Sequence, residues 1–227
     1  MRDEHPQIAL YTAPLSMFAM KVEIALREKR LVFQRISVPY SAASGYDPKH
    51  PDVVRINPKR QVPVLVHGAL EVFDSTQIFE YLEDLAPEPP LWPSTIIDRA
   101  HARQLELKSD EVYFPHVIRL MGLQAELTDA AAVAAIDGAR NYYAEMERLL
   151  EGRQFFVDAL TYADIAFYMA QLFGERMGAQ LTAATPRLIH WRARMTARAA
   201  IRSTLAPFVD HLRSLDRPIP KHLSEAV

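Results

Sequence analysis

The pattern of apolar and polar positions divides the chain into two parts. In the first part, residues 8–13 (IALYTA) and 31–38 (LVFQRISV) form short apolar or alternating runs that predict β-strands. Between them, residues 17–29 repeat apolar positions at helical spacing. A strand, a helix and a second strand of these lengths predict a parallel pair with a right-handed crossover.

A loop rich in proline, serine, glycine and aspartate follows at residues 39–58. After it, two apolar runs separated by Gly68-Ala69 have the spacing of a β-hairpin. The elements predicted in this region are a short helix near 52–56, strands at 62–67 and 70–74, and a helix at 75–85. The order β-α-β, loop, β-β-α predicts an α/β domain.

Pro63 lies near the start of the strand predicted at 62–67, although proline has no N–H for a sheet ladder. One interpretation is that it only trims the end of the strand. The other is a cis Val62–Pro63 bond, which would turn the N–H and C=O of Val62 outward to pair with a peptide-like ligand. Cis X-Pro bonds are roughly 5–6% of such bonds in folded proteins, so Pro63 alone does not decide between the two.

The second part of the chain carries helical periodicity alone, which predicts an all-α domain. It follows the segment APEPPLWPS, residues 86–94, whose four prolines in nine residues predict a connector. The helical patterns occupy residues 97–126, 130–150, 162–176 and 186–196. We therefore predict an α/β domain at 6–86, a linker at 87–94, a helical domain at 95–215 and a tail at 216–227.

Composition narrows the choice of partners and chemistry. The formal net charge of −2 gives no electrostatic reason to expect nucleic acid or an anionic membrane surface as a partner. Charged residues interrupt every long apolar run, and the N-terminal MRDEHPQ lacks the apolar region of a signal peptide. We therefore expect a cytoplasmic protein without a transmembrane helix.

Cysteine is absent from the sequence. The chain therefore has no disulfide, no thiolate zinc ligand and no cysteine nucleophile. Eight histidines remain, but no two have a tight metal-binding helical spacing, and we expect no metal site. Any thiol chemistry must use a thiol that arrives with a ligand.

Two serines stand at predicted helix starts. Ser75 follows Asp74 at the start of the helix at 75–85, and Ser16 precedes the helix at 17–29. One interpretation of each is an N-cap, in which the hydroxyl accepts a hydrogen bond from a free backbone N–H. The other is an anion site, because free N–H groups, the helix dipole and a hydroxyl converge there. For Ser75 the anion would be a carboxylate, and for Ser16 a thiolate or an oxyanion.

Together these features resemble the cytosolic glutathione transferases. The matching features are a strand, Ser16 at a helix start, NPKRQVPVL at 57–65, FDSTQIFEYL at 73–82 and FFVDALTYADIAFY at 155–168. In the last segment, Thr161 and Asp164 have the spacing of a capping box, like the one the family carries in its second domain. The resemblance covers almost the whole chain and implies a thioredoxin-like N-terminal domain followed by an all-α helical bundle.

The resemblance implies a glutathione site in the first domain. In the family, an acidic–serine pair like Asp74-Ser75 holds the γ-glutamyl carboxylate. The residue before a cis-proline, here Val62 before Pro63, pairs with the cysteinyl backbone. We therefore predict that the Val62–Pro63 bond is cis.

The resemblance also implies contacts to the glycyl carboxylate and a hydroxyl that activates the thiol. Gln61 and Lys49 are the carboxylate candidates, although Lys49 equally fits a solvated surface residue. Ser16 lies six residues before Val22, as in serine-type classes such as theta and zeta. Tyr11 is the tyrosine-type alternative, and we favour Ser16 because Tyr11 belongs to the strand. SMFAM replaces the Ser-Ser-Cys cluster of zeta-class proteins, so the class stays open, while the absence of cysteine excludes omega-like and beta-like classes.

The implied reaction is attack of the glutathione thiolate on a hydrophobic electrophile, as in detoxification. Lowering a thiol pKa by two units requires about 2.7 kcal/mol of preferential interaction with the thiolate. One hydrogen bond to a charged acceptor plus a helix end is of that order.

Candidates for the apolar pocket are Phe18, Tyr113, Phe114 and His116, near a kink at Pro115. Aromatic residues at such spacing more often belong to a helical core.

Members of the family are usually dimeric, so we expect a homodimer. Asp110 then either approaches the γ-glutamyl amine bound by the partner subunit or is a solvated helix acid.

Two other functions stay open. YLEDLAPEPPLWP and the long loop before INPKRQVP resemble the branch that cleaves β-aryl ethers or dehalogenates. A non-catalytic glutathione-binding or scaffold protein could also use the same fold.

Overall fold

The computed structural model describes residues 7–41, 43–47 and 49–224. The chain divides into two compact units. One comprises Met1–Pro89 with Ser203–Arg217, and the other comprises Pro90–Arg202 with Pro218–Val227. Residues 203–215 were expected in the helical domain, whereas their contacts group them with the first unit.

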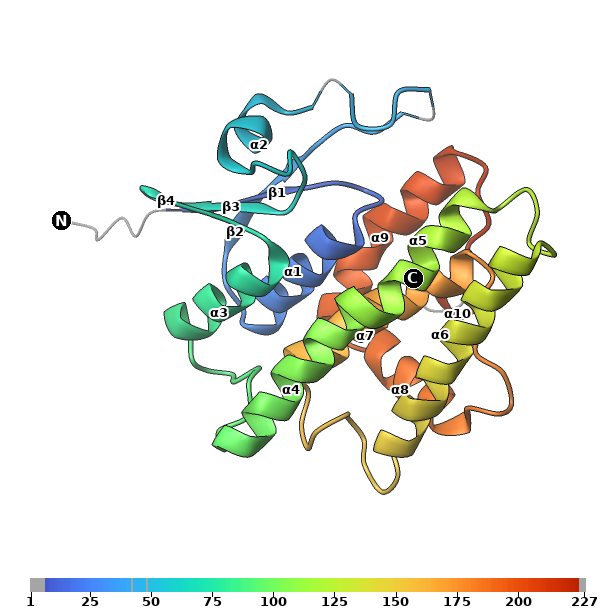
Figure 1. Ribbon diagram of the computed structural model, residues 1–227. Coiled ribbons are helices and arrows are strands. Elements are labelled where there is room, and N and C mark those ends of the chain that lie inside the picture. The colour runs from blue at the N-terminus through green and yellow to red at the C-terminus, as the bar shows by residue number, and fades with distance from the viewer. Residues whose placement is uncertain (1–6, 42, 48, 225–227) are drawn as a thin grey trace. The chain divides into compact units, whose positions relative to one another are not determined.

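The first unit contains a four-stranded sheet in the order β2-β1-β3-β4. Its elements are β1 (Ile8–Thr12), α1 (Met17–Glu28), β2 (Phe33–Ser37), α2 (Pro51–Ile56), β3 (Val64–His67), β4 (Leu70–Phe73) and α3 (Ser75–Leu85). β1 pairs parallel with β2 and antiparallel with β3, and β3 pairs antiparallel with β4. Helices α1 and α3 cover one face of the sheet and α2 lies on the other (Figure 1). This arrangement confirms the predicted thioredoxin-like fold.

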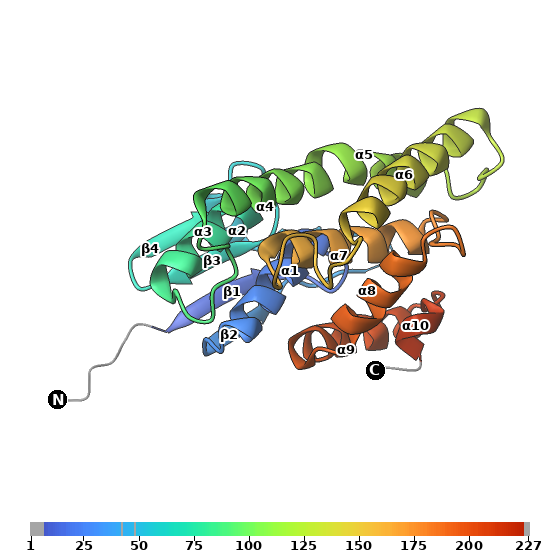
Figure 2. The same cartoon turned by 90° about the horizontal axis from the view of Figure 1, so that it is seen from below.

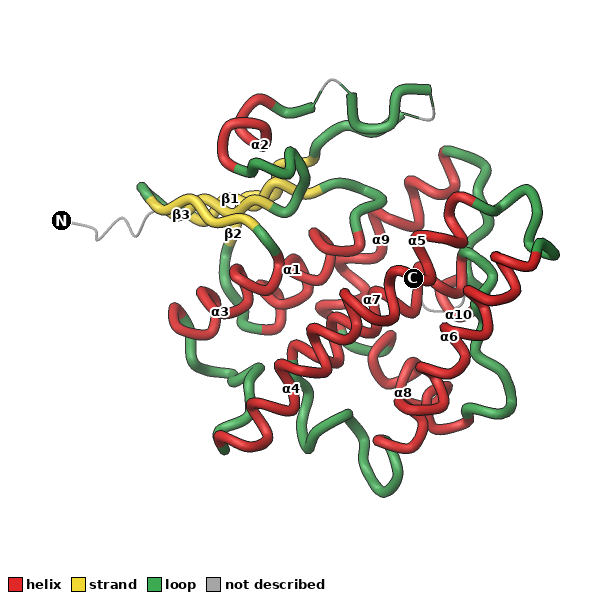
Figure 3. The backbone as a smooth tube through the Cα atoms, viewed as in Figure 1, coloured by secondary structure: helices red, strands yellow, loops and turns green. Residues whose placement is uncertain are grey.

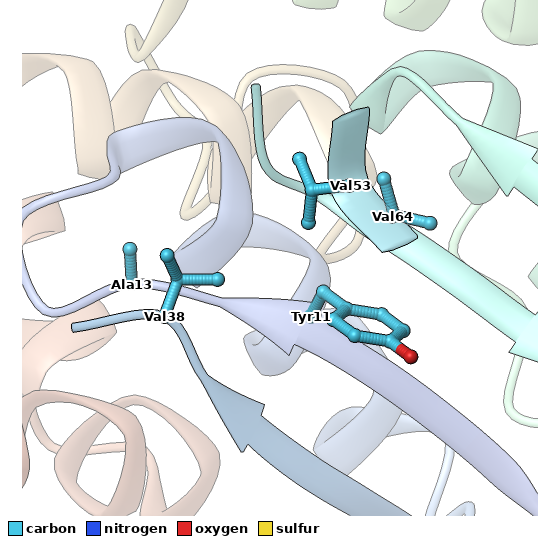
Figure 4. Close-up of a cluster of buried hydrophobic side chains, with 5 residues drawn as sticks. All are labelled: Tyr11, Ala13, Val38, Val53 and Val64. Carbon is cyan, nitrogen blue, oxygen red and sulfur yellow. The ribbon is translucent and has the colours of Figure 1, made fainter. Parts of the chain in front are cut away.

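The core on the α2 side of the sheet determines where the loop before β3 lies. Five buried side chains form this cluster: Tyr11, Ala13, Val38, Val53 and Val64 (Figure 4). They come from β1, the segment that follows it, the segment after β2, α2 and β3. The side chain of Val62 also packs against the cluster. Burial of these apolar groups therefore holds both α2 and the segment that follows it against the sheet.

The second unit is built from helices in the part of the chain that is described (Figure 3). They are α4 (Ile96–Lys108), the π-helical turn η1 (Ser109–Tyr113), α5 (Phe114–Gly122), α6 (Ala130–Leu149), α7 (Tyr162–Arg176), α8 (Pro186–Thr196) and α10 (Lys221–Ser224). α9 (Ala199–Ser214) belongs partly to this unit and partly to the first. This succession of helices confirms the predicted all-α domain. None of the described helices is long and apolar enough to span a bilayer.

Two details differ from the predicted elements. The single helix predicted at 97–126 consists of α4, η1 and α5, with the π-helical turn directly before Pro115. Proline has no N–H for the helical ladder, and a π-helical turn is a common way to accommodate such a break. α9, which contains Pro207, was not among the predicted helices.

α7 is the central helix of the second unit, because every residue from Tyr162 to Gly174 is buried. A helix that is buried all round needs neighbours on every side, and α4, η1 and α5 are among those it contacts (Figure 2). Gly174 permits one close approach, since a Cβ atom there would lie 1.9 Å from the hydroxyl oxygen of Tyr113.

Candidate functional site

Ser16 is the N-cap of α1. Its Oγ accepts a hydrogen bond from the Ala19 N–H at 3.2 Å, and its own N–H donates to the Ala13 carbonyl at 3.2 Å. The cap uses Oγ only as an acceptor, and no described residue accepts the hydroxyl proton. The capping and donor interpretations are therefore compatible, because a hydroxyl can accept and donate at the same time.

Tyr11, the alternative hydroxyl, is already engaged within the first unit. Its hydroxyl donates to the Asp52 carboxylate at 2.8 Å, and its side chain belongs to the buried cluster of Figure 4. Burial and then this hydrogen bond raise the pKa of the Tyr11 hydroxyl. Asp52 in turn accepts from Arg55, which also pairs with Glu71. Tyr11 therefore ties α2 to β1.

Asp74, and not Ser75, is the N-cap of α3. Its Oδ1 accepts from the Thr76 N–H at 3.1 Å and the Gln77 N–H at 3.4 Å. The capping interpretation of Ser75 is therefore wrong, because Ser75 is the first helical residue. The Ser75 N–H and hydroxyl have no hydrogen-bond partner in the described part of the chain. Ser75 is 3% exposed, and its hydroxyl is not among the fully buried side-chain atoms that lack a partner.

The backbone of Asp74 has φ 74° and ψ 130°. A positive φ is uncommon for a residue other than glycine and costs of order 1–3 kcal/mol. Such strain clusters at functional sites, so this outlier supports a functional role for the start of α3.

The Val62–Pro63 bond is cis, as predicted. Val62 is half-buried, with its side chain against the cluster of Figure 4. Its N–H and C=O form no hydrogen bond with any residue that the structure describes. Pro63 is buried, and β3 begins only at Val64.

Cross-strand register brings these segments to one end of the sheet. Val64 pairs with Tyr11 on one side and with Phe73 on the other. The turn that leads to Ser16 follows β1, and the Val62–Pro63 bond precedes β3. Ser75 comes shortly after the end of β4. Because β1 and β4 both run antiparallel to β3, all three segments leave the sheet at the same end.

The two residues predicted for a glycyl carboxylate lie beside the segment before β3. Gln61 has an exposed side chain, and its backbone carbonyl accepts from Asn57 Nδ2 at 2.6 Å. Lys49 donates from Nζ to the Arg60 carbonyl at 3.3 Å, so it ties two parts of the loop together. Asn57, a buried residue of the NPKRQVPVL segment, was not among the predicted site residues.

The pocket candidates lie in different environments. Phe18 is half-buried on α1, with the Lys21 ammonium 5.3 Å from its ring centroid. Tyr113 is fully buried, bonds to the Tyr143 hydroxyl at 2.6 Å, and has its pKa raised by burial well above the ordinary value. We therefore assign Tyr113 to the core of the helical unit.

The other two pocket candidates also pack within the helical unit. Phe114 is buried and contacts the Phe173 ring at 6.5 Å between centroids. The His116 ring lies against α6, since a Cβ atom on Gly138 would be 2.2 Å from its Cε1. Burial and then the charge of Arg119 lower the pKa of His116.

Among the described residues, no group of three or more histidine, aspartate or glutamate side chains is arranged to hold a metal ion.

Comparison with known families matches both parts of the chain. Residues 10–90 match the family model for the glutathione S-transferase N-terminal domain, and residues 101–199 match that for its C-terminal domain. Glutathione S-transferase 1 of Dianthus caryophyllus is 39% identical over 99 residues, 43% of this chain and 42% of that protein. A stringent starvation protein A homolog of Coxiella burnetii is 31% identical over 109 residues, 47% and 48% of the two chains. Over the matched regions, the chain thus spans about half the length of these curated relatives.

Solved structures match over a longer range. A glutathione S-transferase from Rhodospirillum rubrum F11 superposes with a TM-score of 0.79 at 25% identity, covering 97% of this chain and 99% of that one. A glutathione S-transferase of Methylobacterium radiotolerans, solved in complex with glutathione sulfonate, has a TM-score of 0.72 at 28% identity. That match covers 87% of this chain and 94% of the other. The chain belongs to the glutathione S-transferase family.

Proposed function

We propose that the chain is a glutathione transferase whose first unit binds glutathione and activates its thiol for attack on a hydrophobic electrophile. One observation carries this proposal. Three segments leave the same end of the sheet, and each presents hydrogen-bonding groups without a partner among the described residues. These are the Ser16 hydroxyl proton, the Val62 backbone groups, and the Ser75 N–H and hydroxyl. A γ-glutamyl tripeptide offers matching groups.

The start of α3 suits the γ-glutamyl end of glutathione. The Ser75 N–H and hydroxyl can donate to its carboxylate, and the positive end of the helix dipole favours this anion. The Asp74 carboxylate offers the opposite charge for the neighbouring ammonium group. The Val62 N–H and C=O pair with the cysteinyl backbone in the manner of an added strand. Gln61 and Lys49 extend the proposed site to the glycyl carboxylate.

Ser16 is the proposed activating residue. Its hydroxyl keeps a free proton while Oγ caps the helix, so it can donate to the sulfur and favour the thiolate. The thiol proton goes to solvent, the sulfur electron pair forms the new C–S bond, and the leaving group departs with its bonding pair. Tyr11 fits this role less well, because its proton is committed to Asp52 and its pKa is raised.

The electrophile requires an apolar surface near the sulfur. Phe18 is the best supported candidate, because it is half-buried and lies two residues after Ser16 at the start of α1. Phe114 and His116 stay proposals with less support, since both pack within the helical unit. A cytoplasmic location and a role in detoxification belong to the same proposal.

We also propose a homodimer. Exposed apolar side chains in the segment from α4 to α5 support this: Ile97 70%, Leu107 57%, Val112 49% and Ile118 56% exposed. Light scattering on the wild type and on Leu107→Glu tests it. We expect a dimer that the charged residue weakens, and a monomeric wild type would contradict the proposal.

Some similar proteins are named for activities other than glutathione transfer, so a second function should be tested. One is a probable maleylacetoacetate isomerase of Vibrio cholerae, which is 31% identical over 145 residues, covering 64% of this chain and 66% of that protein. The alternatives are isomerisation, β-aryl ether cleavage or dehalogenation, and glutathione binding without turnover. Conjugation of a halonitrobenzene, with neither isomerisation of maleylacetoacetate nor cleavage of a β-aryl ether, would support the transferase.

The decisive test is calorimetric titration with glutathione, followed by titration of the bound thiol. We expect wild-type binding below millimolar concentration, and its absence would remove the proposed function.

Ser16→Ala should bind glutathione nearly as well but raise the bound thiol pKa by about one to two units, as loss of a hydrogen bond to a thiolate predicts. Ser16→Asp keeps the cap acceptor but has no proton to donate, so it should raise this pKa further. Ser94→Ala, at an exposed serine, is the control. An unchanged thiolate titration in both Ser16 variants would refute its role.

A further inference from the structure

Asn57 is a polar residue that is almost entirely buried, with 3% exposure. It follows α2 as its C-cap, and its N–H donates to the Val53 carbonyl at 3.0 Å. Both ends of its side-chain amide are also used. Nδ2 donates to the Gln61 carbonyl at 2.6 Å, and Oδ1 accepts from the Lys59 N–H at 2.9 Å.

These bonds close the turn between α2 and Val62. The Arg60 N–H donates to the Asn57 carbonyl at 2.7 Å, and Arg60 adopts a positive φ of 55°. Lys49 adds a tie from outside the turn, through its hydrogen bond to the Arg60 carbonyl. The backbone and the side chain of one asparagine therefore define the path of the chain into Val62.

Peptide planarity extends this constraint to the Val62 amide. In a trans peptide the C=O and N–H of the same unit point in opposite directions. The Gln61–Val62 bond is not among the cis bonds of the described chain. Because the Gln61 carbonyl points toward the buried Asn57 amide, the Val62 N–H points away from it. The Val62 side chain packs against the cluster of Tyr11, Ala13, Val38, Val53 and Val64, which limits rotation of this segment.

The Val62 N–H has no acceptor among the residues described. The direction of this N–H is set by the Gln61–Val62 peptide unit, yet no group of the described chain accepts its hydrogen bond. Loss of a buried amide whose donor and acceptor are both in use is costly, so the Asn57 side chain strongly fixes this turn. A fixed turn that ends in an unused backbone N–H fits a donor held ready for a ligand.

We propose that Asn57 is a positioning residue that directs the Val62 N–H toward the backbone carbonyl of a bound peptide. This inference rests on the proposed function, and glutathione is the peptide used to test it. Asn57 does not touch the ligand. It acts through the Gln61 carbonyl, so its loss affects peptide binding and leaves activation of the thiol to Ser16.

Asn57→Asp tests this by changing one group. The carboxylate keeps the acceptor for the Lys59 N–H but replaces the donor to the Gln61 carbonyl with a second acceptor. We expect the Kd for glutathione to weaken at least tenfold, as loss of one aligned hydrogen bond predicts. We expect the pKa of the bound thiol and the KM for the electrophile to stay unchanged. Asn141→Asp, at the only other asparagine, makes the same chemical change on an exposed part of α6 and should bind as the wild type does.

A second measurement needs no variant. In the wild type, the Val62 amide proton should exchange rapidly without ligand and become protected, with a large shift of its NMR resonance, when glutathione binds. Asn57→Ala, which removes both side-chain bonds, serves if Asn57→Asp does not fold. Wild-type affinity in a folded Asn57 variant, or an amide resonance that glutathione does not move, would overturn the inference while leaving the proposed function intact. A wild type that does not bind glutathione would overturn both.

Discussion

Two helix starts in this protein use an acidic residue in different ways. At α7, the buried Asp164 accepts four hydrogen bonds: two at 2.9 Å from the N–H and hydroxyl of Thr161, one from the Phe156 N–H at 3.2 Å and one from Trp191 Nε1 at 3.0 Å. At α3, Asp74 accepts from two backbone N–H groups, and the next residue, Ser75, keeps its N–H and hydroxyl without a described partner.

The difference is that the acidic residue satisfies buried donors at one helix start, whereas polar groups stay unpaired within the described chain at the other. The start of α7 is closed, because buried donors from the loop before it and from α8 converge on one carboxylate. This confirms the capping box predicted from Thr161 and Asp164. The start of α3 is open and carries a strained Asp74 backbone. A closed start stabilises the fold, whereas an open start retains groups that a ligand can use.

The largest expected effect is at the closed start. Asp164→Ala leaves four buried donors without an acceptor, and each unsatisfied donor costs about 1–3 kcal/mol, partly relieved by relaxation. We expect the free energy of unfolding to fall by about 3 kcal/mol or more in urea titrations. Asp158→Ala, at an exposed aspartate nearby in the sequence, is the control and should change it by less than about 0.5 kcal/mol. A loss of similar size in both variants would contradict the comparison.

Ser75→Ala should weaken glutathione binding and leave the stability of the fold nearly unchanged. It removes a hydroxyl without a described partner, so the free energy of unfolding should change by less than about 0.5 kcal/mol. Binding should suffer more, because a hydrogen bond to a charged carboxylate contributes about 1.5–3 kcal/mol. Calorimetry should therefore show glutathione affinity falling by about tenfold to a hundredfold, with Ser94→Ala unchanged. An unstable Ser75→Ala with normal affinity would show that this helix start is structural.

A matched pair at Asp74 separates capping from backbone strain. Asp74→Ala removes the cap and keeps a side chain at φ 74°, so we expect a loss of about 1–2 kcal/mol in stability. Asp74→Gly also removes the cap, but glycine adopts a positive φ easily and is itself a tolerated N-cap residue. We expect it to stay within about 0.5 kcal/mol of the wild type in thermal unfolding. Equal losses in the two variants would argue against strain at this position.

The smallest expected effect is a pH dependence at Asp164. Burial raises the pKa of this carboxyl from 3.8 to about 6, although its hydrogen bonds oppose the rise. The folded state therefore binds the proton more tightly, so this group adds stability at low pH that is lost as pH rises through about 6. Between pH 7.5 and pH 5, the gap in stability between the wild type and Asp164→Ala should widen by about 1 kcal/mol. A gap that narrows toward pH 5 would contradict the raised pKa.

Local pattern was sufficient to predict most elements and to nominate several candidate groups of the proposed site. Periodicities of two and of three to four residues located the strands of the first unit and α6, α7 and α8, because alternation and helical spacing follow from local geometry. The segment before β3 was recognised as a family feature, because the residues that identify it are close together in sequence. α9 was missed, since the proline inside it is a local signal against a helix.

What the sequence by itself determined is the order of elements, the absence of a cysteine thiol and the family resemblance. Tertiary structure decided which polar groups are used internally and which have no partner among the described residues. It commits the Tyr11 proton to Asp52 and buries Tyr113, although both residues offered plausible hydroxyls or rings in the sequence. It also brings Asn57 against the Gln61 carbonyl. The physical reason is that hydrogen-bond partners and burial depend on how distant segments pack, which periodicity along the chain does not encode.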